Sequence, residues 1–241
     1  MTRSPDPTGA VLAVAPARPG RDESGSDVVA RFARTAADCA RVGAAVLDLA
    51  PVPGVPLAEP VRAVRRAGLL ARVAATPDAT PAELLSCGAD ALCAPLDAPA
   101  EFLRELRVGV AERGAALHLL ARGAAELALL RDVPEPAHVV VVFTGDGPGA
   151  VAAFASAMDQ LPAGTGRTAA GVGPAGLPVL LTALAGGAHV RIGRGDTPDY
   201  APGTPARDDA QLVARAAGVA KIAQRPPLAP ERAAELLGIK T

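Results

Sequence analysis

The chain has 241 residues, of which 50% are hydrophobic and only 2% aromatic, and its formal net charge is -1. This length can bury the core of one α/β domain or of two small ones. The near-neutral charge and the scarcity of aromatic rings argue against a nucleic-acid partner, which needs a basic surface or stacking side chains.

The cysteine spacing and the N-terminal segment indicate in which cellular compartment the protein is expected. Cys39, Cys87 and Cys93 form no CxxC pair, which argues against a disulfide framework or a cysteine-based zinc site. The first apolar run is interrupted by Pro16 and is too short for a signal core or a membrane span. We therefore expect a cytoplasmic protein without membrane association.

Short apolar runs alternate with longer segments of helical spacing, a pattern typical of strand and helix units around a parallel sheet. Eight such units are found. The predicted strands are Val11 to Ala15, Ala45 to Ala50, Leu70 to Ala75, Ala91 to Ala94, Ala116 to Leu120, His138 to Thr144, Thr168 to Val172 and Ala188 to Gly193.

Several predicted helices carry start signals. Thr80, Pro81 and Glu83 have the order of a capping box with proline in the first turn. The segment "DAPAEFLREL" repeats this order from Asp97, which we expect to begin the next helix. The final segment, "LAPERAAELLGI", predicts an extra C-terminal helix that docks on the rest of the fold.

Eight units in a chain of this length are typical of a (β/α)₈ TIM barrel, with a doubly wound sheet as the alternative. No linker rich in Gly, Pro or Ser separates the units, so we predict one domain over residues 1–241. In a barrel, chemistry belongs at the carboxyl ends of the strands. Those positions hold Arg18, Asp48, Thr76, Cys93, His118, Thr144 with Asp146, Gly171 with Gly173, and Arg191 with Asp196.

The histidines and lysines differ in what they allow. His118 lies late in the fifth strand, where it is expected to point inward as an acid/base group or as a core histidine. His138 and His189 stand at strand starts, and we interpret them as surface or packing residues. Lys221 and Lys240, the only lysines, lie in C-terminal helices, which excludes Schiff-base chemistry.

Cys93 and two glycine-rich turns leave alternatives open. Cys93 is a nucleophile only if a neighbour lowers its pKa, and otherwise a small buried hydrophobe. "GVGPAG" matches GxGxxG, with Asp196 twenty residues beyond its last glycine, as in dinucleotide sites, but six units precede it. "TGDGPG", from Thr144, offers backbone N–H groups that can bind phosphate or carboxylate. For both stretches a tight strand-to-helix turn is the alternative.

The stretch "GLPVLLTALAGGAHVRIGRGDTPDYAPGTPARDDAQLVARAAGVA", followed by "ERAAELLGI", resembles the β-keto acid cleavage enzymes, the family that includes 3-keto-5-aminohexanoate cleavage protein. The resemblance covers Gly171 to Ile239 closely and the rest more loosely, including "GAAVLDLAP". It implies a (β/α)₈ barrel that condenses a β-keto acid with acetyl-CoA and releases acetoacetate and a new CoA ester. It also implies a divalent metal, usually zinc.

In the family, the metal ligands are the two histidines of an HxH motif that ends the second strand and a glutamate after the eighth. Those positions hold Asp48, Ala50 and Gly195 here, so all three ligands are changed. One carboxylate makes a poor zinc site, because a catalytic zinc takes three protein ligands. We therefore predict no metal site and no tightly bound cofactor, with acetyl-CoA as a co-substrate.

Arg191 and Asp196 match an arginine and an aspartate of the family that orient the keto acid and assist proton transfer. His118 falls where the family often has a glutamate on the fifth strand. The resemblance thus implies Arg191, Asp196 and His118 as catalytic residues. The predicted substrate-binding residues are Asp48, Arg18, Thr144 and Gly173.

Two functions follow from this comparison. The first is an enzyme that acts on a small carboxylate, a β-keto acid, without the Lewis acid that the metal provides in the family. The second is a non-catalytic barrel, a pseudoenzyme that keeps a pocket for a carboxylate or an acyl-CoA or serves in assembly. Either protein is expected to be a homo-oligomer.

Overall fold

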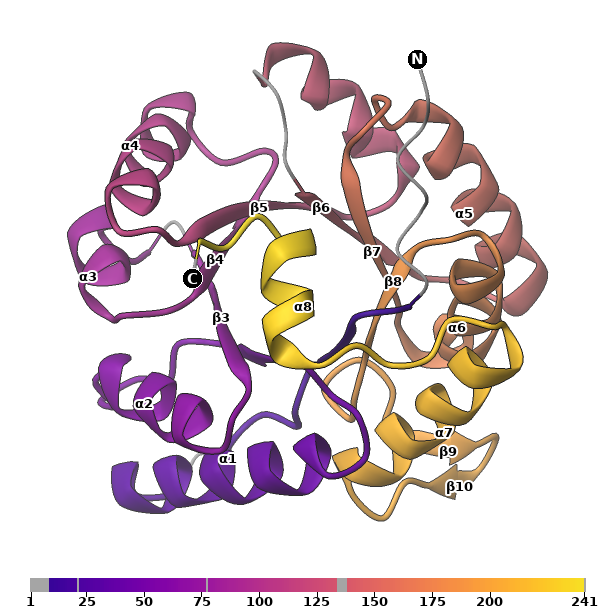
Figure 1. Ribbon diagram of the computed structural model, residues 1–241, viewed down its shortest axis with the longest axis horizontal. Helices are drawn as coiled ribbons and strands as arrows, with labels where there is room; N and C mark the ends of the chain where they lie inside the picture. Colours follow the sequence, from indigo (N-terminus) through magenta and orange to yellow (C-terminus); the bar gives the residue numbers. More distant parts are fainter. Residues whose placement is uncertain (1–8, 21, 77, 134–137, 241) are drawn as a thin grey trace.

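Eight parallel strands close into a barrel in chain order, from β1 to β8, with helices α1 to α7 around the outside of the ring (Figure 1). The computed structural model describes residues 9–20, 22–76, 78–133 and 138–240. β1 pairs with β8 as well as with β2, so the sheet has no open edge. The predicted (β/α)₈ barrel is confirmed, and the doubly wound alternative is wrong.

The barrel strands lie within two residues of their predicted bounds. They are β1 (Leu12–Val14), β2 (Val46–Leu49), β3 (Leu70–Ala74), β4 (Ala91–Pro95), β5 (Ala116–Ala121), β6 (His138–Phe143), β7 (Gly166–Gly171) and β8 (His189–Ile192). The helices are α1 (Gly25–Ala40), α2 (Ala58–Arg66), α3 (Pro81–Ser86), α4 (Ala100–Glu112), α5 (Gly147–Gln160), α6 (Gly176–Ala185), α7 (Asp209–Ile222) and α8 (Pro230–Leu236).

Three connections depart from the simple strand and helix alternation. Between β5 and β6 the chain forms a 3₁₀-helix, η1 (Ala124–Asp132), and a second one, η2 (Gly173–Ala175), precedes α6. After β8 it forms an antiparallel pair of short strands, β9 (Asp199–Ala201) and β10 (Thr204–Pro205). Over the described ranges, no helix has both the length and the apolar content that crossing a bilayer requires.

The predicted capping box is present at α3. The Thr80 side chain accepts a hydrogen bond from the Glu83 backbone N–H, and the Glu83 carboxylate accepts from the Thr80 backbone N–H. The expected start of the next helix at Asp97 is wrong, because α4 begins at Ala100 after Pro99. Asp97 lies too far before the first turn to accept from its N–H groups, and it pairs with Arg122 instead.

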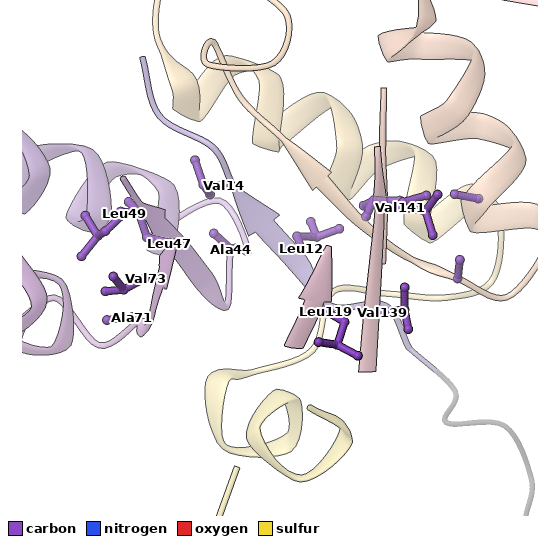
Figure 2. Packing of buried hydrophobic residues seen from close by; sticks show 14 of the residues in the cluster. Leu12, Val14, Ala44, Leu47, Leu49, Ala71, Val73, Leu119, Val139 and Val141 are labelled. Carbon is purple, nitrogen blue, oxygen red and sulfur yellow. The ribbon is translucent and has the colours of Figure 1, made fainter. Parts of the chain in front are cut away.

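The strands separate two hydrophobic cores because successive side chains point to opposite faces. Outward side chains such as Leu12, Leu47, Val73 and Val141 pack against the surrounding helices, and Figure 2 shows part of this cluster. Inward side chains near the strand starts form a smaller core with the last helix. This division leaves the opposite, carboxyl end of the interior free for polar groups.

Helix α8 closes the amino end of the barrel. In Figure 1 it lies across the centre of the strand ring. Its buried residues Ala233 and Ala234, together with Leu237 just after it, pack against strand-start residues that include Val46 and Ala116. The predicted extra C-terminal helix is confirmed, and its position makes it the floor of the barrel.

Candidate functional site

A cavity of about 180 Å³ opens at the carboxyl ends of the strands. Its walls come from the segment after β1, from β2 to β5 and from the end of β8 with the turn that follows. The charged residues in its lining are Arg18, Asp48, Arg72, Arg191 and Asp196. The cavity lies where barrel enzymes of this architecture place their chemistry.

Arg191 and Asp196 form a two-point ion pair at the end of β8. Arg191 donates from Nε to Oδ2 and from Nη2 to Oδ1 of Asp196, both at 2.8 Å. The turn between them needs Gly193, because a Cβ there would lie 2.1 Å from the Ala15 carbonyl oxygen. Burial raises the pKa of Asp196 above its usual value even though Arg191 opposes the shift, so the carboxylate is a stronger base than an exposed aspartate.

A second two-point pair, between Arg72 and Asp48, lies beside the first. Arg72 donates from Nε and Nη2 to the two Asp48 oxygens, both at 2.8 Å. Burial alone would lower the pKa of Arg72, but the charge and hydrogen bonds of Asp48 raise it, so the guanidinium stays charged. Arg191 Nη1 lies 3.9 Å from Asp48 Oδ2, which joins the two pairs into one cluster.

Arg72 was not among the residues that the sequence singled out. Asp48 and Arg72 are direct partners in the register of β2 and β3, and both side chains point inward. The signal was present in the strand "LARVA", where one charged residue interrupts an apolar run between buried neighbours. Arg72 lies in the middle of β3, so it is not among the strand-end positions where the chemistry of a barrel is expected.

His118 supports Arg72 from below the cavity. Its Nε2 lies 2.9 Å from the Leu237 carbonyl oxygen, which can only accept, so Nε2 carries the proton. The bare Nδ1 then accepts from Arg72 Nη1 at 3.3 Å. Burial, together with the charge of Arg72, lowers the pKa of His118 to about 3, so the ring is neutral at physiological pH. The inward orientation is confirmed, but His118 is not part of the cavity lining.

His138 and His189 also lie inside the barrel. Both are buried, and His138 Nε2 lies 2.8 Å from Thr168 Oγ1, while His189 Nδ1 accepts from the Val11 backbone N–H at 3.2 Å. The ring centroids of His118 and His138 are 4.6 Å apart, and those of His138 and His189 are 6.1 Å apart. The surface interpretation of these two histidines is therefore wrong and the packing interpretation is confirmed, because their strand positions face the interior.

The remaining predicted substrate-binding residues divide into two groups. Arg18 lines the cavity with an exposed side chain, and Asp48 lines it as described above. Thr144 is exposed at the end of β6 and lies outside the cavity lining. Gly173 also lies outside it, and its N–H donates to the Asp196 backbone carbonyl at 3.0 Å.

The two glycine-rich turns are accounted for by packing. A Cβ at Gly171 would lie 2.3 Å from the Ala175 carbonyl oxygen, and one at Gly176 would lie 2.5 Å from Thr197 Oγ1. In "TGDGPG", Asp146 caps α5 by accepting from the Gly149 N–H at 3.0 Å. These glycines permit tight strand-to-helix turns, the alternative that the sequence left open for both stretches.

Cys93 lines the cavity but lacks the chemistry of a nucleophile. Burial raises the pKa of its thiol, although Arg72 opposes the shift, so the thiolate is disfavoured. All three cysteines are free and buried. The small-hydrophobe alternative fits Cys93 best.

The positions that correspond to the family's metal ligands do not fit a divalent metal. Both Asp48 oxygens already accept from Arg72, and Ala50 has no donor atom. A Cβ at Gly195 would lie 2.6 Å from the Pro16 carbonyl oxygen, so no longer side chain can reach inward from there without moving the backbone. Among the described side chains, no group of three or more His, Cys, Asp or Glu is arranged to hold a metal ion.

Solved structures confirm the fold at low sequence identity. The 3-dehydroquinate dehydratase from Aquifex aeolicus VF5 superposes with a TM-score of 0.62 at 14% identity, covering 88% of this chain and 98% of that one. Orotidine 5'-phosphate decarboxylase from Pyrococcus horikoshii OT3 gives 0.58 at 14% identity, with 88% and 99% covered. A type I 3-dehydroquinate dehydratase from Clostridium difficile gives 0.63 at 10% identity, with 90% and 93% covered.

A sequence-family comparison is more specific. The family model described as beta-keto acid cleavage enzyme matches residues 110–239, more than half of the chain. The matched region runs from the end of α4 through β8 to the end of the floor helix, and it includes Arg191 and Asp196. The chain belongs to the β-keto acid cleavage enzyme family.

Proposed function

We propose that the protein binds a small β-keto carboxylate in the cavity at the barrel mouth and carries out the family's acyl exchange on it. In this reaction a β-keto acid condenses with acetyl-CoA, and acetoacetate and a new CoA ester are released. The observation that carries the proposal is the joined cluster of Arg191, Asp196, Arg72 and Asp48 inside one cavity, with Arg18 at its edge.

The charges of the cavity favour an anionic ligand. Asp196 balances Arg191 and Asp48 balances Arg72 in two pairs at hydrogen-bond distance. Arg18 adds an exposed guanidinium to the same lining, which leaves one unit of positive charge. A carboxylate is the ligand that a guanidinium fork binds best, so Arg18 is proposed to hold it with its fork. Arg191, whose Nε and Nη2 already donate to Asp196, is proposed to add a bond from Nη1.

Asp196 is the proposed acid/base group. It is buried, its pKa is raised, and its carboxylate lies in the cavity lining. The hydrogens between the keto and carboxylate groups of a β-keto acid are the most acidic C–H groups of the substrate. A positioned base whose pKa lies nearer to neutrality removes such a proton more effectively than an ordinary carboxylate.

A second function has its own support. The positions of the family's metal ligands carry one carboxylate between them, and Gly195 leaves no space for another. A protein that kept the pocket but lost turnover would have these features. We therefore propose, as the alternative, a pseudoenzyme that binds a carboxylate or an acyl-CoA without converting it.

The first test is binding of acetoacetate, followed by calorimetry. We expect Arg18→Met to weaken binding about 10-fold or more, because a hydrogen bond to a charged group contributes about 1.5–3 kcal/mol. Arg65→Met is the matched control, since Arg65 forms an ion pair with Asp90 away from this cavity. A wild-type protein that binds no β-keto acid would contradict the proposal.

Turnover separates the two functions. The wild-type protein is incubated with acetyl-CoA and a panel of β-keto acids, and new CoA esters are sought by mass spectrometry. A new ester with release of acetoacetate supports the enzyme. Binding without any new ester across the panel supports the pseudoenzyme.

A further inference from the structure

The guanidinium of Arg72 is a buried cation at the base of the cavity. Its side chain is 2% exposed, yet it belongs to the cavity lining. Two of its N–H groups are donated to Asp48 and one to His118. These three bonds leave one N–H on each terminal nitrogen without an acceptor among the described residues.

The group is held rigidly from two sides. Asp48 fixes the plane of the guanidinium through two bonds of 2.8 Å, and His118 contacts Nη1 at 3.3 Å. His118 is itself anchored by the Leu237 carbonyl oxygen, next to the floor helix α8. Donors that are oriented before the reaction stabilise developing charge without a reorganisation cost.

We infer that Arg72 acts directly on the reacting keto group, in the place where the family's metal ion does not fit this chain. Its two remaining N–H groups donate to the keto oxygen of a β-keto carboxylate whose acid group is held by Arg18 and Arg191. The inference rests on the proposed function, and it adds a catalytic residue that sequence resemblance does not supply.

The step that Arg72 assists is enolate formation. Asp196 takes a proton from the carbon between the keto and carboxylate groups. The C–H electron pair becomes the C=C bond of the enolate, and the π pair of the C=O bond moves to the oxygen. The new negative charge then lies on the oxygen that accepts from Arg72. No oxidant, reductant or second substrate is needed for this step.

Deuterium exchange isolates this step from the rest of the reaction. Acetoacetate is incubated in D₂O, and loss of its α-proton signal is followed by NMR with and without protein. We expect exchange above the buffer rate with the wild-type protein, and the same rate after treatment with a chelator. Exchange that disappears on chelation would overturn the inference, because a metal would then perform the role given to Arg72.

Arg72→Lys tests the residue itself, because it keeps the charge and loses the fork. We expect exchange to slow by about 100-fold or more, as when one oxyanion donor is removed from other enzymes. Acetoacetate binding should change much less, since Arg18 and Arg191 remain. Arg65→Met, which removes a guanidinium from a surface Arg–Asp pair, should leave both quantities unchanged.

Loss of a buried cation can also unfold the protein, so two further measurements are included. Arg72→Met combined with Asp48→Leu removes both charges, which proteins tolerate better than one unpaired charge. In the wild-type protein, acetoacetate should bind more tightly than butyrate, which keeps the carboxylate but lacks the keto oxygen. Equal binding of the two acids would overturn the inference without any variant.

The outcomes separate the inference from the proposed function. Folded Arg72 variants that exchange deuterium at the wild-type rate overturn the role of Arg72 and leave the proposed function standing. A wild-type protein that neither binds acetoacetate nor exchanges its α-protons overturns the proposed function, and the role of Arg72 with it. Slow exchange with retained binding in the variants supports both.

Discussion

Gly195 shows how one residue decides what the site can hold. A Cβ at this position would meet the Pro16 carbonyl oxygen at 2.6 Å and the Ala15 carbonyl oxygen at 3.0 Å. Both contacts are with backbone, which cannot rotate away as a side chain can. The turn after β8 and the segment after β1 have therefore closed on each other where the family places a metal-binding side chain.

Substitution of Gly195 is predicted to destabilise the protein. Gly195→Ala should lower the free energy of unfolding by about 1–3 kcal/mol, because the backbone of the turn must shift. Gly218→Ala is the control, since Gly218 is exposed in α7 and an added Cβ there meets nothing within 4 Å. It should stabilise by about 0.5–1 kcal/mol. Urea unfolding of both variants checks this, and equal effects would contradict it.

At the residue scale, the sequence indicated three of the four residues of the charged cluster and did not indicate Arg72. Asp48, Arg191 and Asp196 follow or end apolar runs, where a barrel carries its chemistry, and the structure gathers them in one cavity. Arg72 could be recognised as the partner of Asp48 only from the pairing between β2 and β3, which apolar periodicity does not provide. Thr144 follows a strand as well, but it lies one residue beyond β6, where its side chain is exposed and outside the cavity lining.

Helix α8 links the floor of the barrel to the site above it. Leu237 contributes a buried side chain to the inner core and a carbonyl oxygen to His118. His118 in turn contacts Arg72. Packing at the amino end of the barrel thus sets the orientation of a charged group at the base of the cavity.

Replacing either of two adjacent leucines at the end of α8 with alanine is predicted to lower the free energy of unfolding by unequal amounts. Leu237→Ala should destabilise by about 2–5 kcal/mol, because it removes a fully buried side chain and leaves a cavity. Leu236→Ala should cost clearly less, since Leu236 is only partly buried. Thermal and urea unfolding measure the difference. Similar small losses in both variants would show that the helix is not firmly docked.

At the element scale, hydrophobic alternation predicted all eight strands and the final helix, because each buries one apolar face. Sequence signals for the first residue of a helix predicted less reliably than this alternation. Thr80 caps as expected, while Pro99 separates Asp97 from the first turn of α4. The 3₁₀-helix after β5 and the small β9 and β10 pair were not predicted, since short segments leave no clear period in a sequence.

His118 and His138 make the stability of the whole molecule depend on pH. Burial lowers the pKa of His118 to about 3, and it also lowers that of His138, to which the neighbouring His118 contributes. In the unfolded chain, a histidine has a pKa of about 6.5. Below that pH the unfolded state binds protons that the folded state does not, so stability falls as the pH falls.

The predicted loss of stability with falling pH is steep enough to measure. Between pH 6.5 and 5, each of these two histidines should remove up to about 1.4 kcal/mol of stability per pH unit. His118→Gln should reduce the slope, even if the variant is less stable at pH 7.5. Urea unfolding at a series of pH values gives both quantities. Stability that stays constant over this interval would contradict the burial of neutral histidines.

Ring closure was also predictable, because eight units of this length have few other stable arrangements. The assembly state was not, since the surfaces that would join copies have no periodic signal. Leu177 and Leu181 of α6 are 42% and 47% exposed, so this helix carries some apolar surface. The expected homo-oligomer stays a prediction.

The pairing of β1 with β8 has a consequence for synthesis on the ribosome. Leu12, Ala13 and Val14 of β1 pair with Val190, Arg191 and Ile192 of β8, so the first strand emerges with this edge unpaired until the eighth strand has been made. The same eighth strand brings Arg191. A nascent chain halted before this strand therefore exposes a strand edge prone to aggregation, and it also lacks Arg191, one of the two residues proposed to hold the ligand. Synthesis of β8 therefore covers this edge and supplies Arg191 at the same time.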